Sequence, residues 1–298
     1  MQWTGEVARG DWIRDRLAGW GNVGGVVPRG FEAYARILHP ITAYRGEETV
    51  PWRWAEVAAR TGRTMHPLVQ SQRLFGSEPA DLEFPDGWSP SLPEEGRLEP
   101  ELLAQLTGHL RTHGREQAIT LGVWCGWGEI NGSSTPMLFW GPIDGPPWWR
   151  RWYFRVFRPL INHQMRRRHH AEKMASIAPD IARALHRTDG YAGPLLLHLP
   201  AREYVLLTAT LDELADPTWP RSAGIGWHGS FSGPMPALIW PDDHAWCVAT
   251  EIDFDSTLVG GSRSLVDAIL TDDTFEAFEV HPDDDLTWDG DTINPPVS

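Results

Sequence analysis

The hydrophobic residues of this chain are grouped in short runs that glycine, proline and polar residues interrupt. The chain has 298 residues, of which 29 are glycine and 25 are proline. A typical long run, 204–211, has the length of a β-strand and contains threonine. A membrane-spanning helix needs roughly 18 apolar residues in a row, so none is expected. Strand and helix patterns alternate irregularly, which favours an α+β fold of mixed, mainly antiparallel sheets packed with a few helices.

Apolar periodicity and capping residues predict the individual elements. Leucines at helical spacing, with Pro100 near the start and Gly114 after the end, predict a helix over 99–113. The expected helices cover 52–60, 99–113, 174–187 and 262–270, and the expected strands cover 31–39, 117–124, 137–140, 195–199, 203–209, 237–240, 245–254 and 275–280. The segment 79–97 is rich in proline, serine and acidic residues, and is expected to be an exposed loop.

Charge is distributed unevenly along the chain. The formal net charge is −14, and from Asp242 onward there are fifteen acidic residues and one arginine. Residues 150–173 instead carry eight basic residues and one acidic residue. This predicts an N-terminal α+β region over 1–145, a basic aromatic segment over 146–173 that is a candidate insertion, and an acidic C-terminal α+β region over 174–298. One continuous globular domain is the alternative. The acidic region favours a basic protein partner.

The N-terminal residues and the cysteines indicate a reducing compartment. No basic stretch followed by an apolar stretch opens the sequence, so no signal peptide is expected. Cys125 and Cys247 lie in apolar stretches, where cysteine usually behaves as a small buried hydrophobic residue. Two cysteines without a C-x-x-C spacing are too few for a zinc cluster. The sequence therefore favours a cytoplasmic location and predicts no cofactor, with a divalent cation as the one alternative.

That alternative rests on three acidic residues, Glu251, Asp253 and Asp255, which accompany the expected strand over 245–254. Residues two apart in a strand point to the same face, so the three carboxylates would form one cluster. Three like charges need a counter-ion, which makes the cluster a candidate site for a divalent cation. The other interpretation is a charged, solvent-facing strand edge that discourages pairing with a second chain.

The stretch 252–258, Ile-Asp-Phe-Asp-Ser-Thr-Leu, resembles the first motif of haloacid-dehalogenase-like phosphatases. The resemblance implies that Asp253 is a nucleophile and Asp255 an acid–base residue, with magnesium between them. Only 43 residues follow Asp255, and the single lysine of the chain, Lys173, lies upstream. The remaining core of that family and its phosphate-binding lysine have no counterpart here, so we interpret the match as chance.

Residues 146–157 combine aromatic and basic side chains. The candidate partner-contacting residues are Trp148, Trp149, Arg150, Arg151, Trp152 and Arg155. We first expect the aromatic rings to dock into the protein's own core while the arginines meet the acidic C-terminal region. Peripheral contact with an anionic membrane surface ranks second. Nucleic acid is the least favoured partner, because the net negative charge of the chain repels polyanions.

Four further residues are candidates for lining a pocket: His39, His66, Trp124 and Trp127. Each histidine precedes a proline, and we favour the alternative in which it is a capped turn residue. Trp124 directly precedes a glycine-rich turn at 125–128, and Trp127 lies within that turn. The chain has 17 tryptophans, and tryptophan is frequent both in cores and in binding hot spots.

The common catalytic motifs do not occur in the sequence. It contains no phosphate-binding loop ending in Lys-Ser/Thr, no G-x-S-x-G and no H-E-x-x-H. An acidic stretch at 283–291 matches part of a calcium-binding loop, but the twelfth position is Pro296 instead of glutamate. That stretch is therefore expected to be a solvated loop.

Four stretches together resemble a family of uncharacterised actinobacterial proteins: 34–40, 53–58, 121–124 with 126–128, and 240–261. The resemblance runs along most of the chain and implies no activity, cofactor or catalytic residue. The absent motifs, the acidic C-terminal region and the many tryptophans favour a non-enzymatic, soluble binding or interaction protein of the immunity or antitoxin kind. The alternative is a metal-dependent hydrolase that uses Glu251, Asp253 and Asp255.

Overall fold

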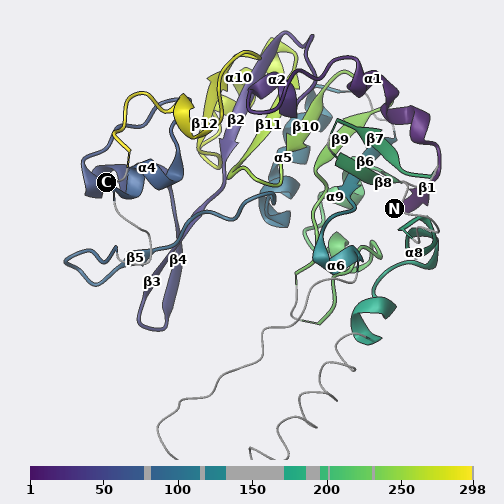
Figure 1. The fold of residues 1–298 in the computed structure, drawn as a ribbon, viewed down its shortest axis with the longest axis horizontal. Coiled ribbons are helices and arrows are strands. Elements are labelled where there is room, and N and C mark those ends of the chain that lie inside the picture. The colour runs from purple at the N-terminus through teal and green to yellow at the C-terminus, as the bar shows by residue number, and fades with distance from the viewer. Residues whose placement is uncertain are drawn as a thin grey trace, which may run out of the picture.

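A computed structural model describes residues 1–76, 82–114, 118–131, 171–185, 195–200, 202–229 and 232–296. Within these residues, nine strands form one large sheet in which every pairing is antiparallel (Figure 1). Its order is β1 (Gln2–Thr4), β8 (Arg202–Ala209), β6 (Ile119–Trp124), β9 (Leu238–Pro241), β10 (Cys247–Thr250), β11 (Ser256–Gly261), β2 (Ala33–Leu38) and β12 (Ala277–Val280). The ninth strand, β7 (Leu197–Leu199), pairs with β8 on the edge that β1 also uses.

The large sheet is covered on both faces. One face packs against α5 (Pro100–Thr112), α8 (Pro179–Leu185), α9 (Leu211–Leu214) and α10 (Arg263–Leu270). The other face packs against α1 (Asp11–Arg14), α2 (Val23–Val26) and Leu286. The central strands of the sheet are therefore buried on both faces, because successive side chains point to opposite sides. In β2, Ala35 and Ile37 contact the first cluster and Tyr34 contacts the second.

Three short strands form a second, smaller sheet to one side (Figure 1). They are β3 (Ile41–Arg45), β4 (Glu48–Trp52) and β5 (Ser89–Pro90), and the helices α3 (Trp54–Thr61) and α4 (Ser71–Phe75) pack with Leu38 and Ile41 next to them. Shorter helical segments among the described residues include α6 (Gly128–Asn131) and 3-10 turns at Val7–Gly10, Trp219–Arg221 and Trp288–Gly290. No helix in the described ranges is both long and apolar enough to cross a membrane.

The expected α+β fold with mainly antiparallel sheets is confirmed, and most expected elements lie within a few residues of their observed positions. The predicted C-terminal cap of α3 is present, because Gly62 adopts the left-handed conformation with φ 70°. Strands of the large sheet come from both the 1–145 and the 174–298 regions. The strand expected over 137–140 lies outside the described residues.

Three local expectations were wrong. The strand expected over 245–254 ends at Thr250, and residues 251–255 form the turn of the β10–β11 hairpin. The loop expected over 79–97 contains β5, and Phe84 and Trp88 within it are buried in an aromatic cluster. The helix expected over 174–187 is interrupted at 176–178, because Pro179 begins a new helix instead of continuing the earlier one.

Candidate functional site

A row of three polar side chains crosses the strands β7, β8 and β6. His198 on β7 lies directly opposite Glu203 on β8. On the other side of β8, the amide of Cys125 donates a hydrogen bond to the carbonyl of Glu203 at 2.9 Å, one residue beyond the end of β6. Opposed residues of antiparallel strands project to the same face, so the three side chains stand side by side. The His198 Nδ1 and Glu203 Oε1 atoms are 3.6 Å apart.

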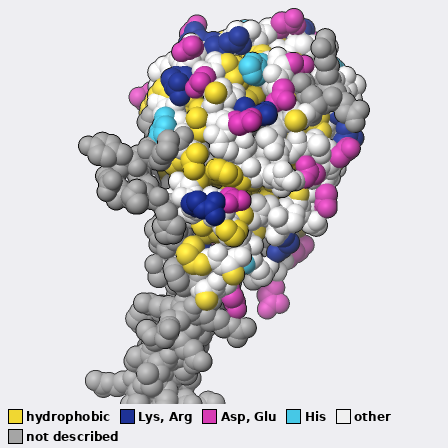
Figure 2. Space-filling view, turned by 90° about the vertical axis from the view of Figure 1, so that its right-hand side faces the viewer, with side chains coloured by type: hydrophobic (Ala, Val, Ile, Leu, Met, Phe, Trp, Pro, Cys, Tyr) yellow, Lys and Arg dark blue, Asp and Glu magenta, His cyan; other side chains and the backbone are white. Residues whose placement is uncertain are grey.

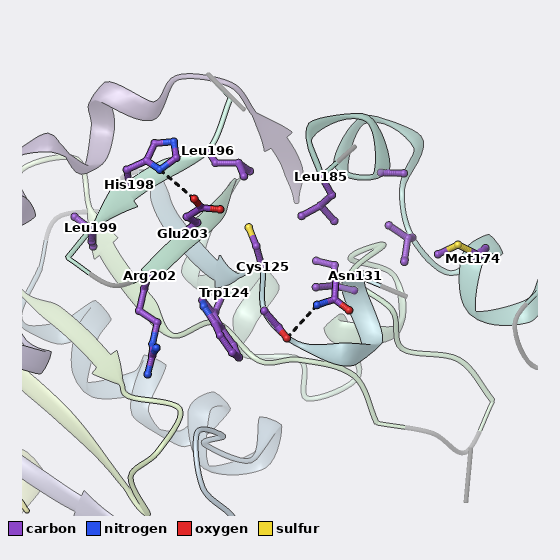
Figure 3. A pocket seen from close by; sticks show the side chains of 14 residues that line it. Trp124, Cys125, Asn131, Met174, Leu185, Leu196, His198, Leu199, Arg202 and Glu203 are labelled. Atoms are coloured by element: carbon purple, nitrogen blue, oxygen red, sulfur yellow. Dashed lines mark hydrogen bonds and ion pairs between the residues drawn. The ribbon is translucent and has the colours of Figure 1, made fainter. Parts of the chain in front are cut away.

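This row borders a cavity of about 720 Å³ (Figure 3). Its polar wall is the sheet, with His198, Glu203 and Cys125. Its apolar wall comes from α6, α8 and the residues before α8, and the side chains there are Ile130, Met174, Ile177, Ala182 and Leu185. Figure 3 shows the two walls facing each other, with Leu196 on the sheet side. The cavity therefore offers a polar surface opposite an apolar one.

One end of the cavity is formed by Arg202 and Trp124. The Arg202 guanidinium lies 5.3 Å from the centre of the Trp124 ring, which is a cation–π contact. Trp124 meets Trp127 edge to face, with ring centres 5.9 Å apart. Both tryptophans were predicted to line a pocket. Trp124 does line this cavity, whereas Trp127 contacts Trp124 and lies under the Arg97 guanidinium, 4.5 Å from it.

The surface on this side of the protein carries further apolar groups. Figure 2 shows the face that lies at the right of Figure 1, and hydrophobic side chains gather in its middle.

The residues predicted to contact a partner or a membrane lie outside the described residues. They are Trp148, Trp149, Arg150, Arg151, Trp152 and Arg155.

The predicted carboxylate cluster is divided between two arginines. Glu251 Oε1 accepts hydrogen bonds from Arg202 at 2.6 and 3.2 Å, and Asp253 accepts one from the same guanidinium at 2.9 Å. Asp255 is turned toward the other side of the hairpin. The three side chains do not share a strand face, because they occupy a turn. Among the described residues, no group of three His, Cys, Asp or Glu side chains is arranged to hold a metal ion.

Asp255 belongs to a buried polar network around Arg36. Ser71 donates to Asp255 at 2.6 Å, and Arg36 donates to it at 3.4 Å. Arg36 is 1% exposed, and it also donates to Ser256 and to the carbonyls of Pro67 and Val69, each at 2.9 Å. A buried guanidinium is tolerated only when its donors are satisfied. Arg36 therefore fastens the segment before α4 to the large sheet.

Neither His39 nor His66 lines the cavity bordered by His198 and Glu203. His39 is 2% exposed, and its ring contacts the Glu94 carbonyl at 2.7 Å and Thr257 Oγ1 at 2.9 Å. Burial lowers the pKa of His39 to about 4, so its ring is neutral at physiological pH. His66 Nε2 lies 2.8 Å from the fully buried carboxylate of Asp291. Both histidines therefore hold segments of the chain together.

No known protein family matches this chain, and the comparisons with curated proteins and with solved structures find no match either.

Sequence reasoning did not single out Glu203, His198 or Arg202 as site residues. The predicted hairpin of 195–199 and 203–209 could have indicated them. In such a hairpin, His198 and Glu203 lie next to the turn on opposite strands, where their side chains would face each other. Cys125 was noted as an apolar strand residue. It is in fact half-buried beside Glu203, whereas Cys247 is fully buried. Burial raises the pKa of the Cys247 thiol.

Proposed function

We propose that this protein is a non-enzymatic binding protein that receives an amphipathic cation in the cavity between β6–β7–β8 and α8. The observation that carries the proposal is the row of His198, Glu203 and Cys125 opposite an apolar helical wall. The basic protein partner expected from the acidic C-terminal region stays a separate prediction, because the cavity specifies a charge and a shape but no protein.

The size and the lining of the cavity support a small ligand. Ligand sites in proteins commonly have volumes of roughly 300–1,000 Å³, apolar walls and a few polar groups that orient the ligand. A volume of about 720 Å³ lies within that range. The helical side chains can cover an apolar body, and the sheet can bind a polar end. A ligand with both parts would fill the cavity and satisfy both walls.

The distribution of charge supports a positive polar end. Arg202, the basic residue at the end of the cavity, is already paired with Glu251 and Asp253. Glu203 adds a carboxylate to the polar wall, and a carboxylate accepts hydrogen bonds and carries the charge opposite to that of a cationic ligand. The formal net charge of −14 also raises the local concentration of cations around the protein.

Calorimetric titration with three probes tests the proposal. Octylammonium carries a positive end and an apolar tail, octyl sulfate reverses the charge, and methylammonium lacks the tail. We expect octylammonium to bind at least tenfold more tightly than either of the others. Glu203→Gln should weaken its binding about tenfold, which corresponds to roughly 1.4 kcal/mol. Glu47→Gln, in the exposed turn between β3 and β4, is the matched control and should bind normally.

Cys125 offers a second readout that locates the ligand. Cys247 is 0% exposed, so a thiol reagent applied to the native protein should modify Cys125 first. Bound octylammonium should slow that modification. The proposal is wrong if all three probes bind equally, or if binding leaves the rate at Cys125 unchanged.

A further inference from the structure

A second cavity, of about 310 Å³, lies on the opposite face of the β7–β8 hairpin. Side chains alternate along β8, so Arg202 and Tyr204 project away from the face that carries Glu203. Glu251, from the β10–β11 turn, joins them at the polar end of this cavity. Leu17 and Trp20, from the segment after α1, line its apolar side. Arg202 borders both cavities.

The polar end of the second cavity has hydrogen-bonding capacity that the described residues do not use. Tyr204 is 6% exposed, and within the described ranges its hydroxyl forms no hydrogen bond. Arg202 binds Glu251 Oε1 through Nε and Nη2, which leaves Arg202 Nη1 and Glu251 Oε2 without such bonds among those residues. Burial, followed by the charge of Glu251, raises the pKa of Tyr204, so its hydroxyl stays protonated. One end of the cavity therefore carries three different hydrogen-bonding groups. Arg202 Nη1 is a donor, Glu251 Oε2 is an acceptor, and the Tyr204 hydroxyl is both.

The mouth of the cavity carries an exposed aromatic ring. Trp20 is 67% exposed, although a large apolar side chain gains free energy from burial. Its ring centre lies 6.0 Å from that of Phe254, which belongs to the same turn as Glu251. An exposed indole beside unused polar groups provides a flat apolar surface for a ligand that has one apolar face.

We propose that this second cavity binds a neutral, polyhydroxylated ring of the size of a monosaccharide, stacked on Trp20 and hydrogen-bonded to Tyr204, Arg202 and Glu251. Each hydroxyl of such a ring is both a donor and an acceptor, which matches the mixed character of the three groups. A cation fits less well, because the Glu251 carboxylate at this end is already paired with the Arg202 guanidinium. A volume of about 310 Å³, near the lower limit of common ligand sites, suits a single ring.

Saturation-transfer NMR with glucose, galactose, mannose and ribose tests this proposal, with tetramethylammonium as the cationic probe. We expect transfer to at least one sugar, at least a fivefold loss of affinity for it in Tyr204→Phe and in Trp20→Ala, and no transfer to tetramethylammonium. Tyr44→Phe and Trp288→Ala make the same changes at positions outside this cavity, which are 45% and 38% exposed, and should bind like the unmodified protein.

Three outcomes would overturn the proposal: no transfer to any of the four sugars, preference for tetramethylammonium, or equal effects of the test and control variants. Circular dichroism of each variant separates loss of binding from loss of fold. Glu203→Gln should leave sugar binding unchanged, because Glu203 lies on the other face of the hairpin. The two ligand proposals can therefore fail independently.

Discussion

Polar side chains at the two ends of the large sheet have different surroundings. At the β2–β11 end, the polar side chains are directed into the protein. Arg36 donates hydrogen bonds to Asp255 and Ser256, and the His39 ring is hydrogen-bonded to Thr257. At the β7–β8 end, Glu203 and Arg202 border cavities. Both ends contain an arginine paired with a carboxylate from the 251–255 turn. The pairing alone therefore does not distinguish a structural group from a binding group.

The exposed fraction of each arginine, and the presence of a cavity beside it, do distinguish the two ends. Arg36 is 1% exposed, and the described structure gives it four different oxygen-bearing partners. The side chain of Arg202 is 22% exposed and stacks on a ring that itself lines a cavity. We infer that the first end stabilises the fold and that the second end is available for a ligand. The following changes test this difference.

The largest effect is expected from Arg36→Met. The substitution leaves the Asp255 carboxylate without its guanidinium and the carbonyls of Pro67 and Val69 without a donor, so we expect a loss of about 3–5 kcal/mol in the free energy of unfolding. Arg202→Met, the same change at the other end, should cost about 1 kcal/mol, because that pair is closer to solvent. Urea unfolding measures both. Equal losses would show that the two ends do not differ.

A slightly smaller effect is expected from protonation of His39. Its pKa is lowered from 6.5 to about 4 by burial, so the unfolded chain takes up a proton that the folded protein does not. Stability should therefore fall as the pH is lowered from about 6.5 to about 4, by an amount on the order of 3 kcal/mol. In His39→Gln this part of the pH dependence should disappear. Urea unfolding at pH 7, 5.5 and 4.5 gives the comparison, and parallel curves for the two proteins would contradict it.

A third effect concerns the segment after the last 3-10 turn. The buried Asp291 carboxylate accepts bonds from the amides of Gln70 and Asn294, at 3.1 and 2.9 Å, as well as from His66. An amide at this position has one acceptor oxygen in place of two, so Asp291→Asn should cost about 1–2 kcal/mol. Asp289→Asn, at an exposed position two residues earlier, should change stability by less than 0.5 kcal/mol. A thermal melt of both variants decides whether Asp291 holds this segment.

The smallest effect on stability is expected at the cavity itself. Glu203→Gln replaces a partly exposed carboxylate with an isosteric amide, and the free energy of unfolding should change by no more than about 0.5 kcal/mol. The same variant should lose most of its affinity for octylammonium. A loss of 2 kcal/mol or more in urea unfolding would instead make Glu203 a structural residue like Asp255.

The sequence was sufficient to predict elements whose patterns are local. The hairpin of β7 and β8, the helix α5 and the cap at Gly62 follow from alternation, periodicity and glycine chemistry. Trp124 was also expected at a pocket, and it lines the first cavity. The conformation of these elements is determined mainly by residues that are close to them in the sequence.

Features that depend on distant partners were not predictable in the same way. Glu251, Asp253 and Asp255 suggested a strand face, and no local signal showed that a turn would divide them between Arg202 and Arg36. The cavity exists because β6 and β7 lie on either side of β8, with α8 opposite them. The spacing of residues along the chain does not indicate such long-range pairings, because the alternation of apolar residues in a strand is the same whichever strand pairs with it.

The position of β2 in the sheet has a consequence for the synthesis of this protein. β2 covers residues 33–38, but its two neighbours, β11 and β12, lie within residues 256–280. While the chain grows on the ribosome, an apolar strand made early must wait for partners made late. The large sheet therefore closes only after residues 256–280 have been synthesised, and a nascent chain stalled before residue 256 exposes β2 to chaperones and to aggregation.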